Sequence, residues 1–427
     1  MRTKTELHEE PIENRQKCKY GREKEVSYWD KRARKSVKYR CPHDVVKDEY
    51  CIFHHPEYWK ENPEEVRNKF YQEIKAAMTL NEDVVCIGYN LPAIKMSDTG
   101  FRKYDSIYFY FNYCKFFESA DFSGVTLEFA TFFRATFETA NFFDTKFESA
   151  NFSEVIFESA EFNKVTFGSA YFIDTEFRSV DFVEVQFGYA DFHLAKFEHV
   201  DFYEAVFKHV YFRETTFEFV RFIEVKFEFV DFTDTLIGFG DFSYAVFEDI
   251  AIFKKRNYKL YEESNDPLES FWQKVEVKIF QNESILILYL VTFKNPQNVT
   301  FIDFPLSNMS FLMTDVSDIL LICSASEIKK EGILSERLLN GIKINNDFID
   351  EAIETLDPLL RQETVLAEYR NIRKSFEKNR TFAEASELFI REMRMMRQNL
   401  SIPEKIVHYI YDGLSRYGES FIRPLGI

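Results

Sequence analysis

Phenylalanine returns at every fifth position through a long central stretch of this sequence. Between residues 117 and 252 the fifth-residue column has 28 positions, of which 25 are Phe and the others are Leu127, Ile237 and Ile252. Five residues rotate an α-helix by about 500°, and five is an odd step on a strand, so neither element would keep the rings on one face. The spacing therefore predicts a chain that turns a corner every five residues and directs each ring toward a central axis.

A smaller side chain accompanies each ring. Two residues before the ring stands Ala, Val or Thr at 25 of the 28 positions, and the departures are Lys115, Gly240 and Ile250. One large and one small inward side chain per five residues would fill a narrow interior at even density. Both columns return in residues 299–321, so we expect one more coil there.

The segments ANFSEVIFESAEFNKVTF (150–167) and YADFHLAKFEHVDFYEAVF (189–207) resemble the pentapeptide repeat family. The resemblance implies a mainly β fold, a right-handed quadrilateral β-helix (pentapeptide solenoid), with four repeats per coil. It also implies that the Asp or Asn found directly before many of the rings forms hydrogen bonds at the corners of the coil.

The chain is expected to divide into five segments. They are a small N-terminal Cys/His module with a linker (1–100), the solenoid (101–253), an insertion (254–298), a final solenoid coil (299–323) and a C-terminal helical domain (324–427). The insertion is expected to be a hairpin or a helix. Terminal coils of a solenoid need covers, and the irregular aromatic segment 109–117 is expected to supply one.

Three cysteines and one histidine of the N-terminal module are candidate metal ligands. In CIFHHP, Cys51 and His54 stand three residues apart, a spacing that lets both reach one ion from a tight turn. With Cys18 and Cys41 they would form a tetrahedral site for one structural zinc ion, because four protein ligands leave no open position. The substitute ligands are His43 and His55. The alternative interpretation is that these cysteines are ordinary buried residues.

The C-terminal residues have helical patterns. Residues 363–398 show the apolar spacing of an antiparallel helix pair, and 400–418 predict a third helix with Ser401 as its N-cap and Pro403 in its first turn. This tail is similar to that of a subset of pentapeptide repeat proteins, in which the motif seen here as EYRNIRKSFE (368–377) leads into membrane helices like an ion-channel pore. Because this chain ends at SFIRPLGI, we expect no channel activity. A soluble or shortened relative, or a regulator, of such a channel is one alternative function.

Acidic residues are concentrated in the solenoid. Residues 117–252 contain 26 Asp and Glu against 9 Lys and Arg, a difference equal to the net charge of −17 of the whole chain. Residues 20 apart would stack, so Glu184, Glu204 and Glu224 are expected to form a ladder with rungs about 4.8 Å apart. This charge density is similar to that of duplex DNA and suggests a second alternative, an acidic DNA mimic that binds DNA gyrase. Because the acids lie on all four faces, we favour solubility and partner recognition.

Outward-facing aromatic residues also fall into columns. His199, Phe219 and Phe239 share one side, and Tyr189, His209 and Phe229 share the opposite one. Exposed apolar ladders usually mark contacts, and we expect the chain's own insertion or helices to cover them in preference to a partner. The candidate interaction surface consists of Phe219, Phe229, Phe239, Glu184, Glu204 and Glu224.

The sequence favours a binding protein over an enzyme. It has no Gly-rich phosphate loop, nucleophile elbow or zinc-protease motif, and a filled coil offers no concave pocket. The N-terminus lacks the apolar core of a signal peptide, and no apolar run reaches the roughly 20 residues that span a bilayer. We therefore expect a cytoplasmic, non-enzymatic scaffold with an unidentified protein partner and no direct nucleic-acid binding. Membrane association and a homodimer stay open.

Overall fold

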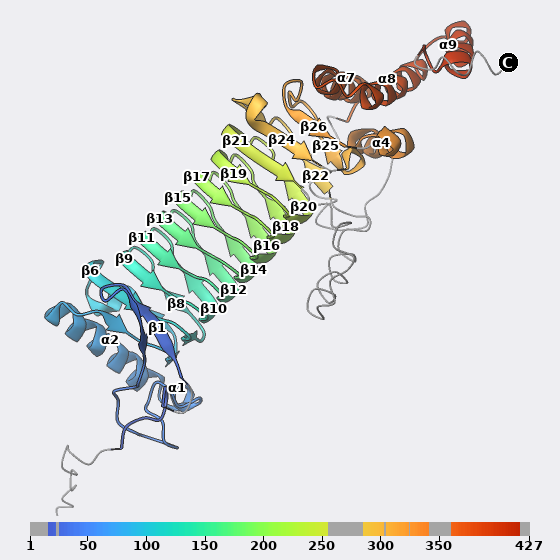
Figure 1. Cartoon of the computed structure of the whole chain (residues 1–427). Coiled ribbons are helices and arrows are strands. Elements are labelled where there is room, and N and C mark those ends of the chain that lie inside the picture. Colours follow the sequence, from blue (N-terminus) through green and yellow to red (C-terminus); the bar gives the residue numbers. More distant parts are fainter. Residues whose placement is uncertain are drawn as a thin grey trace, which may run out of the picture. The chain divides into compact units, whose positions relative to one another are not determined.

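The computed structural model describes residues 16–22, 25–254, 285–302, 305–323, 325–340 and 360–418 (Figure 1). Contacts divide the chain into two compact units, Met1–Val180 and Asp181–Ile427. The boundary falls inside one strand, β14 (Glu176–Asp181). Each unit therefore contains its own set of coils and its own covering elements.

Parallel strands build the coils of the first unit. β10 (Thr136–Asn141) pairs with β12 (Ile156–Glu161), and β11 (Lys146–Asn151) pairs with β13 (Thr166–Tyr171). Paired residues are 20 apart, as in Phe137 opposite Phe157. Successive strands thus belong alternately to two sheets, and one coil takes 20 residues. The β-solenoid predicted from the sequence is confirmed.

The coils begin earlier than the column of rings predicts. β6 (Lys103–Tyr110) pairs with β9 (Thr126–Thr131), so part of the expected aromatic cap is itself a coil. Three short strands that precede it are β3 (Val84–Val85), β4 (Asn90–Leu91) and β5 (Ile94–Lys95), which pair with β6, β7 (Lys115–Phe116) and β8 (Ala120–Asp121). Pairing in the two solenoid sheets therefore starts at residue 84, inside the segment expected to hold the module and linker.

The second unit continues the same pattern. One of its sheets contains β15 (Gln186–Asp191), β17 (Val206–Tyr211), β19 (Lys226–Asp231), β21 (Val246–Lys254), β24 (Val299–Ile302) and β26 (Leu320–Ile322). The other contains β16 (Lys196–Asp201), β18 (Thr216–Arg221), β20 (Leu236–Asp241), β22 (Ile285–Ile287) and β25 (Met309–Ser310). The column expected in residues 299–321 is buried, as Phe311 and Val316 show.

The expected insertion ends sooner than residue 298. Residues 255–284 lie outside the described residues, but Ile285 is opposite Phe239 in parallel register. Phe293 of β23 (Thr292–Phe293) stacks on Phe247, with ring centroids 5.2 Å apart. The coil therefore resumes at residue 285, and the two columns are hidden there inside the continuous apolar run SILILYLVTF.

The rings fill the interior of the coils. Every column position from Phe122 to Phe247 is at most 4% exposed. Rings one coil apart stack in parallel: the centroids of Phe132 and Phe152 are 4.9 Å apart, with an angle of 1° between the planes. Burying one such side chain contributes about 1.5–3 kcal/mol, so the column is a principal source of stability in each unit.

The predicted column is wrong at its two ends. Phe116, which is 1% exposed, lies opposite Phe137, while Phe117 stacks on Trp59 at 4.1 Å. At the other end Phe253 is buried in place of Ile252, because the pairing of β21 shifts register. A strict count of five fails where the chain leaves the regular coil.

Only every second corner is a tight turn with a left-handed residue. Arg134, Asp144 and Glu154 have φ values of 58°, 53° and 57°, and the strands run through the corners between them. At several of these turns the Asp or Asn before the ring accepts the backbone N–H two residues later, as Asn141 Oδ1 does from Phe143 at 2.8 Å. These are the hydrogen bonds expected at the corners. The tight turns recur every ten residues, whereas the column of rings repeats every five and does not reveal which corners are tight.

Helices flank the coils of both units. The first unit has the hairpin of β1 (Ser27–Asp30) and β2 (Lys35–Lys38), then α1 (Tyr58–Glu61), α2 (Pro63–Leu80) and the 3₁₀ helix η2 (Met96–Thr99). The second has η4 (Pro296–Asn298), η5 (Leu306–Asn308), α4 (Ala325–Glu331), α5 (Leu334–Leu339), α7 (Gln362–Lys378), α8 (Phe382–Arg397) and α9 (Ile402–Ser415). The helical C-terminal region is confirmed, and Ser401 caps α9 as predicted.

Candidate functional site

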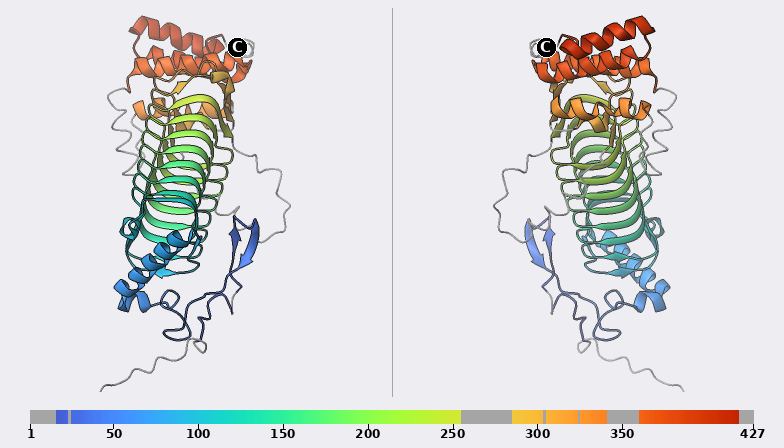
Figure 2. Two further views of the ribbon diagram at one scale, coloured as in Figure 1. Left: turned by 90° about the vertical axis from the view of Figure 1, so that its left-hand side faces the viewer. Right: turned by 90° about the vertical axis from the view of Figure 1, so that its right-hand side faces the viewer.

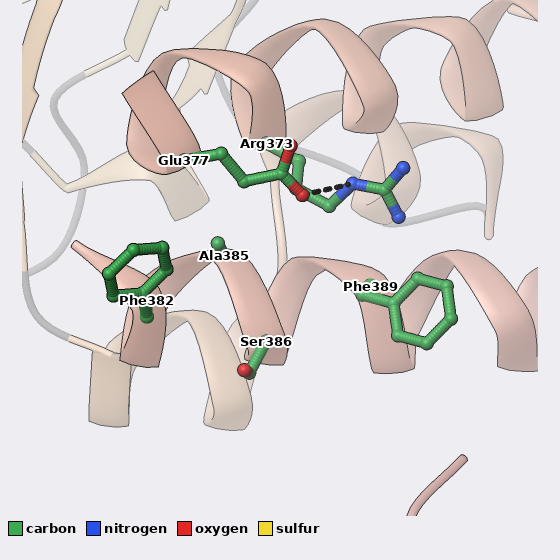
Figure 3. Close-up of a pocket in the computed structure, with 6 residues that line it drawn as sticks. All are labelled: Arg373, Glu377, Phe382, Ala385, Ser386 and Phe389. Carbon is green, nitrogen blue, oxygen red and sulfur yellow. Dashed lines mark ion pairs between the residues drawn. The ribbon is translucent and has the colours of Figure 1, made fainter. Parts of the chain in front are cut away.

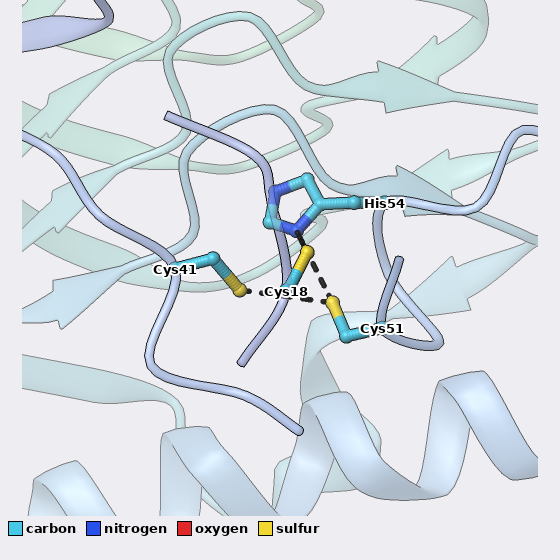
Figure 4. Close-up of side chains that lie close together, drawn as sticks. All are labelled: Cys18, Cys41, Cys51 and His54. Carbon is cyan, nitrogen blue, oxygen red and sulfur yellow. Dashed lines mark hydrogen bonds between the residues drawn. The ribbon is translucent and has the colours of Figure 1, made fainter. Parts of the chain in front are cut away.

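The four predicted metal ligands lie together in the first unit. The ligand atoms of Cys18, Cys41, Cys51 and His54 are all within 4.8 Å of one another, and all four residues are buried (Figure 4). A turn brings Cys51 and His54 together, since the N–H of His54 donates to the carbonyl of Cys51 at 3.1 Å. Backbone pairing brings in the other two cysteines, from segments far apart in the sequence.

The spacing of these atoms fits a tetrahedral ion. Zn–S bonds of about 2.3 Å and Zn–N bonds of about 2.0 Å give tetrahedral edges of about 3.8 Å between two sulfurs and about 3.5 Å between sulfur and nitrogen. The Sγ atoms of Cys41 and Cys51 are 3.7 Å apart, and His54 Nδ1 lies 3.6 Å from Cys18 Sγ and 3.1 Å from Cys51 Sγ. The set could hold a metal without rearrangement of the backbone.

Outer contacts fix the orientation of the imidazole. His54 Nε2 is 2.8 Å from the carbonyl of Ile87, so this nitrogen carries the proton and Nδ1 keeps its lone pair toward the sulfurs. Tyr20 stacks on the ring with centroids 4.0 Å apart. The substitute ligands have other partners: His43 Nε2 meets Tyr89 and Glu73, and His55 Nε2 meets Asp48. The donors are therefore the three thiols and His54.

The pKa values of the three thiols shift in different directions. Side-chain hydrogen bonds from Cys41 and Cys51 hold the pKa of Cys18 far below its ordinary value. The same contacts with Cys18 raise the pKa of Cys41 and that of Cys51. A thiolate is the form that ligates a metal, and Cys18 is the thiol of the three whose pKa is lowered.

The loop that carries His54 also supports the first coil. The N–H of Asn90, in β4, donates to the carbonyl of Phe53 at 2.8 Å, next to the contact between His54 and Ile87. α2 covers the same coil with its apolar face, and Arg67 Nε donates to the carbonyl of Ala93 at 2.7 Å. The Cys/His cluster is thus part of the cover of the first coil.

Sequence reasoning missed α2 as this cover. Its buried side chains recur at helical spacing after a proline at the first helical position, a signal that the segment 63–80 does contain. The buried residues of this face are Val66, Phe70, Tyr71, Ile74 and Ala77. The expected cap, 109–117, instead supplies coil residues such as Phe111, which is fully buried.

α7 lies across the end of the last coil of the second unit (Figure 2), and its polar side chains bond the backbone there. Three of them, spaced along one face of the helix, bond backbone groups of residues 311–319. The pairs are Glu368 Oε1 with the N–H of Phe311 (2.6 Å), Asn371 Oδ1 with the N–H of Val316 (3.3 Å) and Ser375 Oγ with the carbonyl of Ile319 (2.7 Å). These bonds replace those that a further coil would make.

The acidic ladder occupies one edge of the second unit. Glu184, Glu204 and Glu224 are exposed and have φ values of 55°, 52° and 57°, so they occupy equivalent tight turns of successive coils. Their backbones are in register, since the N–H of Glu184 donates to the carbonyl of Tyr203 at 2.8 Å. We call this the acidic edge and define it as residues 183–184, 203–204 and 223–224.

Aromatic side chains accompany the acidic edge. Tyr203 is 38% exposed, and its hydroxyl donates to Glu224 Oε1 at 3.4 Å. One turn further along, Tyr244 is 48% exposed and contacts Tyr289, with ring centroids 5.5 Å apart. The sequence analysis missed these tyrosines, although Tyr203 directly precedes Glu204 and Tyr244 stands twenty residues after Glu224.

Phe239 is not available to a partner. It is 1% exposed and packs with Ile285, Ile287, Leu312, Leu334 and Leu338 of its own unit. Phe219 packs partly against this cluster, and Phe229 is half-buried. The expectation that the chain covers its own aromatic column holds for Phe239, so the predicted interaction surface is wrong at this residue.

A hollow of about 420 Å³ lies between α7 and α8 (Figure 3). Its lining residues are Arg373, Glu377, Phe382, Ala385, Ser386 and Phe389. Arg373 and Glu377 form an ion pair at 3.3 Å, and the guanidinium of Arg373 also lies over the ring of Phe389. Arg373 also pairs with Glu392 at 2.9 Å, so both charged groups of this hollow have ion-pair partners.

Within the described residues, no helix combines the length and apolar character that a bilayer crossing requires.

The family model for pentapeptide repeats matches residues 117–158, 160–198 and 201–236, in eight copies. An uncharacterized protein of Methanocaldococcus jannaschii is 37% identical over 153 residues, which are 33% of this chain and 32% of that protein. The chain thus spans about a third of that relative, and the family match extends over the strands from β8 to β19.

Proposed function

Because this chain is a pentapeptide repeat protein, we propose that it is a non-enzymatic scaffold that binds a partner protein along the acidic edge. The observation that carries the proposal is the repetition of one exposed carboxylate and one apolar side chain on each of three successive turns. A surface repeated at coil spacing can bind an extended partner at several points at once.

The edge selects for a basic partner with apolar contacts. Glu184, Glu204 and Glu224 would attract lysine and arginine side chains and raise the rate of association. Tyr203 and Ile223 would supply the apolar centre that distinguishes a specific interface from a charged surface. The exposed Tyr203 and the half-buried Ile223 on this edge favour a specific protein interface over imitation of duplex DNA, which has no apolar side chains at its edge.

The interior of the coils supports a role without catalysis. In the described coils the inward positions are occupied by buried rings and by small buried side chains, as in a densely packed interior. The scaffold is therefore proposed to act through its outer surface.

We further propose that Cys18, Cys41, Cys51 and His54 hold one structural zinc ion. Three sulfurs and one nitrogen match the ligand preference of zinc, and four protein donors leave no position for substrate. A bound ion would fix the loop that bonds the first coil through Phe53 and His54. Its role would be to keep the cover of that coil folded.

Matched charge variants test the acidic edge. Glu184, Glu204 and Glu224 are changed together to Gln, and in a control Glu198, Glu218 and Glu228, which are exposed on strands, are changed in the same way. Immobilised parent, edge variant and control variant are exposed to lysate of the native cell at low and physiological salt. We expect at least one basic protein whose binding is reduced at least tenfold by the edge variant and is unchanged in the control.

Binding measurements with the purified partner then distinguish the contribution of charge to affinity from that of apolar contact. Tyr203→Ala with Tyr244→Ala should weaken its binding at high salt, where screening removes most of the charge term. Equal binding by the parent, the edge variant and the tyrosine variant would overturn the proposal that this edge is the binding surface.

A further inference from the structure

α9 is attached to its neighbour through its polar side. Asp412, which is 9% exposed, is the buried residue of this helix. Its two carboxylate oxygens accept hydrogen bonds from Nε and Nη2 of Arg394, both at 2.9 Å, and Arg397 adds a third contact at 3.3 Å. These guanidinium groups lower the pKa of Asp412. The usual arrangement of an amphipathic helix, apolar side inward, is therefore reversed.

The apolar side of α9 faces outward. At about 100° per residue its apolar positions fill one broad arc, and the charged residues lie on the opposite side. The exposed members are Ile402 (76%), Ile406 (54%), Val407 (64%), Tyr409 (61%), Ile410 (56%), Tyr411 (51%) and Leu414 (43%). Single exposed apolar residues are ordinary, but a continuous patch of this kind marks a contact.

The charges of α9 argue against an anionic lipid surface as its occupant. A helix that lies on a membrane usually has a polar side rich in Lys and Arg. Here Glu404 and Asp412 balance Lys405 and Arg416, and Arg416 is paired with Glu387 at 2.6 Å. A neutral partner face is the better match.

The spacing of the patch is self-complementary. Ile402, Ile406, Ile410 and Leu414 are four residues apart and symmetric about His408. If a second α9 crosses antiparallel at that point, Ile406 lies against Ile410 of the partner subunit and Ile402 against Leu414 of the partner subunit. Ridges of this spacing pack into each other in the commonest class of helix contact, and a two-fold axis requires such a patch.

The patch is also large enough. Seven side chains of this size, each about half exposed, offer on the order of 700 Å² per chain, close to the roughly 800 Å² per partner that a stable interface buries. Gly413 lies within the arc, and a Cβ placed there would have no atom within 4 Å, so the crossing helix can approach the backbone. We propose that α9 is a dimerisation helix that pairs antiparallel with α9 of a second copy of this chain.

The mass of the full chain in solution tests this proposal. Sedimentation equilibrium between 1 and 100 µM should give twice the 50.9 kDa of the chain, and Ile406→Glu with Ile410→Glu should raise the dissociation constant at least 100-fold. The matched control places the same change at Ile156 and Ile322, which are 38% and 41% exposed and lie in strands. Circular dichroism and melting should agree between the two variants, because all four residues are at the surface.

Either of two results would overturn the dimer, and two further observations on a monomeric parent would identify what covers the patch instead. The parent would be monomeric at 100 µM, or the two double variants would dissociate equally. In one case the monomeric parent floats with vesicles of phosphatidylserine and phosphatidylcholine, and the double variant Ile406→Glu with Ile410→Glu does not float. That result would assign α9 to a lipid surface. Finally, a monomer in which amides of α9 are protected from hydrogen exchange would show that the patch is covered by its own chain.

Discussion

The first coil of the first unit and the last coil of the second are closed by different chemistry. At the first, the apolar face of α2 covers the rings, and a separate loop beside the Cys/His cluster bonds the backbone. At the last, α7 does both, since its buried face contains Tyr369 and Phe376 as well as the polar residues Glu368 and Ser375. One end therefore depends on a loop that a metal would organise, and the other on a carboxylate buried in a helix interface.

The largest expected effect concerns the metal-organised end. Cys51→Ser, or removal of the ion by a chelator, should destabilise the first unit by about 3–5 kcal/mol, because binding free energy at such a site is folding free energy. Urea denaturation and hydrogen exchange would show the loss in residues 84–110 and not in α7. Metal analysis of the purified protein should give one equivalent of zinc.

Cys323→Ser is the matched control for this prediction. Cys323 is half-buried in the second unit and lies outside the cluster. Two findings together would contradict the prediction: the purified protein contains no zinc, and the Cys51→Ser and Cys323→Ser variants melt at the same temperature. The cluster would then be an ordinary group of buried residues.

The second effect is a pH dependence at the α7 end. Burial raises the pKa of Glu368 to about 7, although the side chain of Ser335 and the N–H of Phe311 act in the opposite direction. The folded chain then binds more protons than the unfolded chain between about pH 4.5 and 7, so the stability contributed by Glu368 is full below that window and falls as the pH rises through it, by on the order of 3 kcal/mol.

Glu368→Gln should remove this slope from the unfolding free energy measured between pH 4 and 8. The exposed neighbour Glu363→Gln should keep it. The first unit retains a slope of the same sign, because burial also raises the pKa of Glu73 to about 7. A slope unchanged in Glu368→Gln would mean that the carboxylate is ionised in the folded protein and that the interface admits water.

The smallest expected effect distinguishes the stability due to backbone hydrogen bonds from that due to apolar packing where α7 covers the last coil. Asn371→Ala removes a hydrogen bond to the N–H of Val316 and should cost about 1–2 kcal/mol, measured by urea denaturation. Lys374→Ala, at an exposed position on the same helix, should change stability by less than about 0.5 kcal/mol. Equal effects would indicate that α7 covers the last coil by apolar contact alone.

The sequence predicted the regular parts of the molecule because one constraint repeats there. Each inward Phe must satisfy the same packing as its neighbours one coil away, so the period alone defines the coil and its two inward columns. Cys51 and His54 of the Cys/His cluster were predictable from their spacing, because a thiol and an imidazole three residues apart can reach one ion from a tight turn. The second pair, Cys18 and Cys41, follows from backbone pairing that the sequence does not display.

The parts that sequence could not predict lie where the repeat meets something else. The shift from Phe117 to Phe116 depends on the contact with Trp59, and the return of the coil at Ile285 is hidden in an apolar run without visible alternation. Tight turns at every second corner follow from backbone geometry and leave no mark on the ring column. The outward orientation of the apolar side of α9 depends on the ion pairs of Asp412, which no periodicity reveals.

Two adjacent phenylalanines test the central claim that every fifth ring fills the coil. Phe142 is fully buried in the column, whereas its neighbour Phe143 is 42% exposed. By urea denaturation, Phe142→Ala should lose about 3–5 kcal/mol and Phe143→Ala less than about 1 kcal/mol. Equal losses, or a larger loss for Phe143→Ala, would contradict a coil with a ring-filled interior.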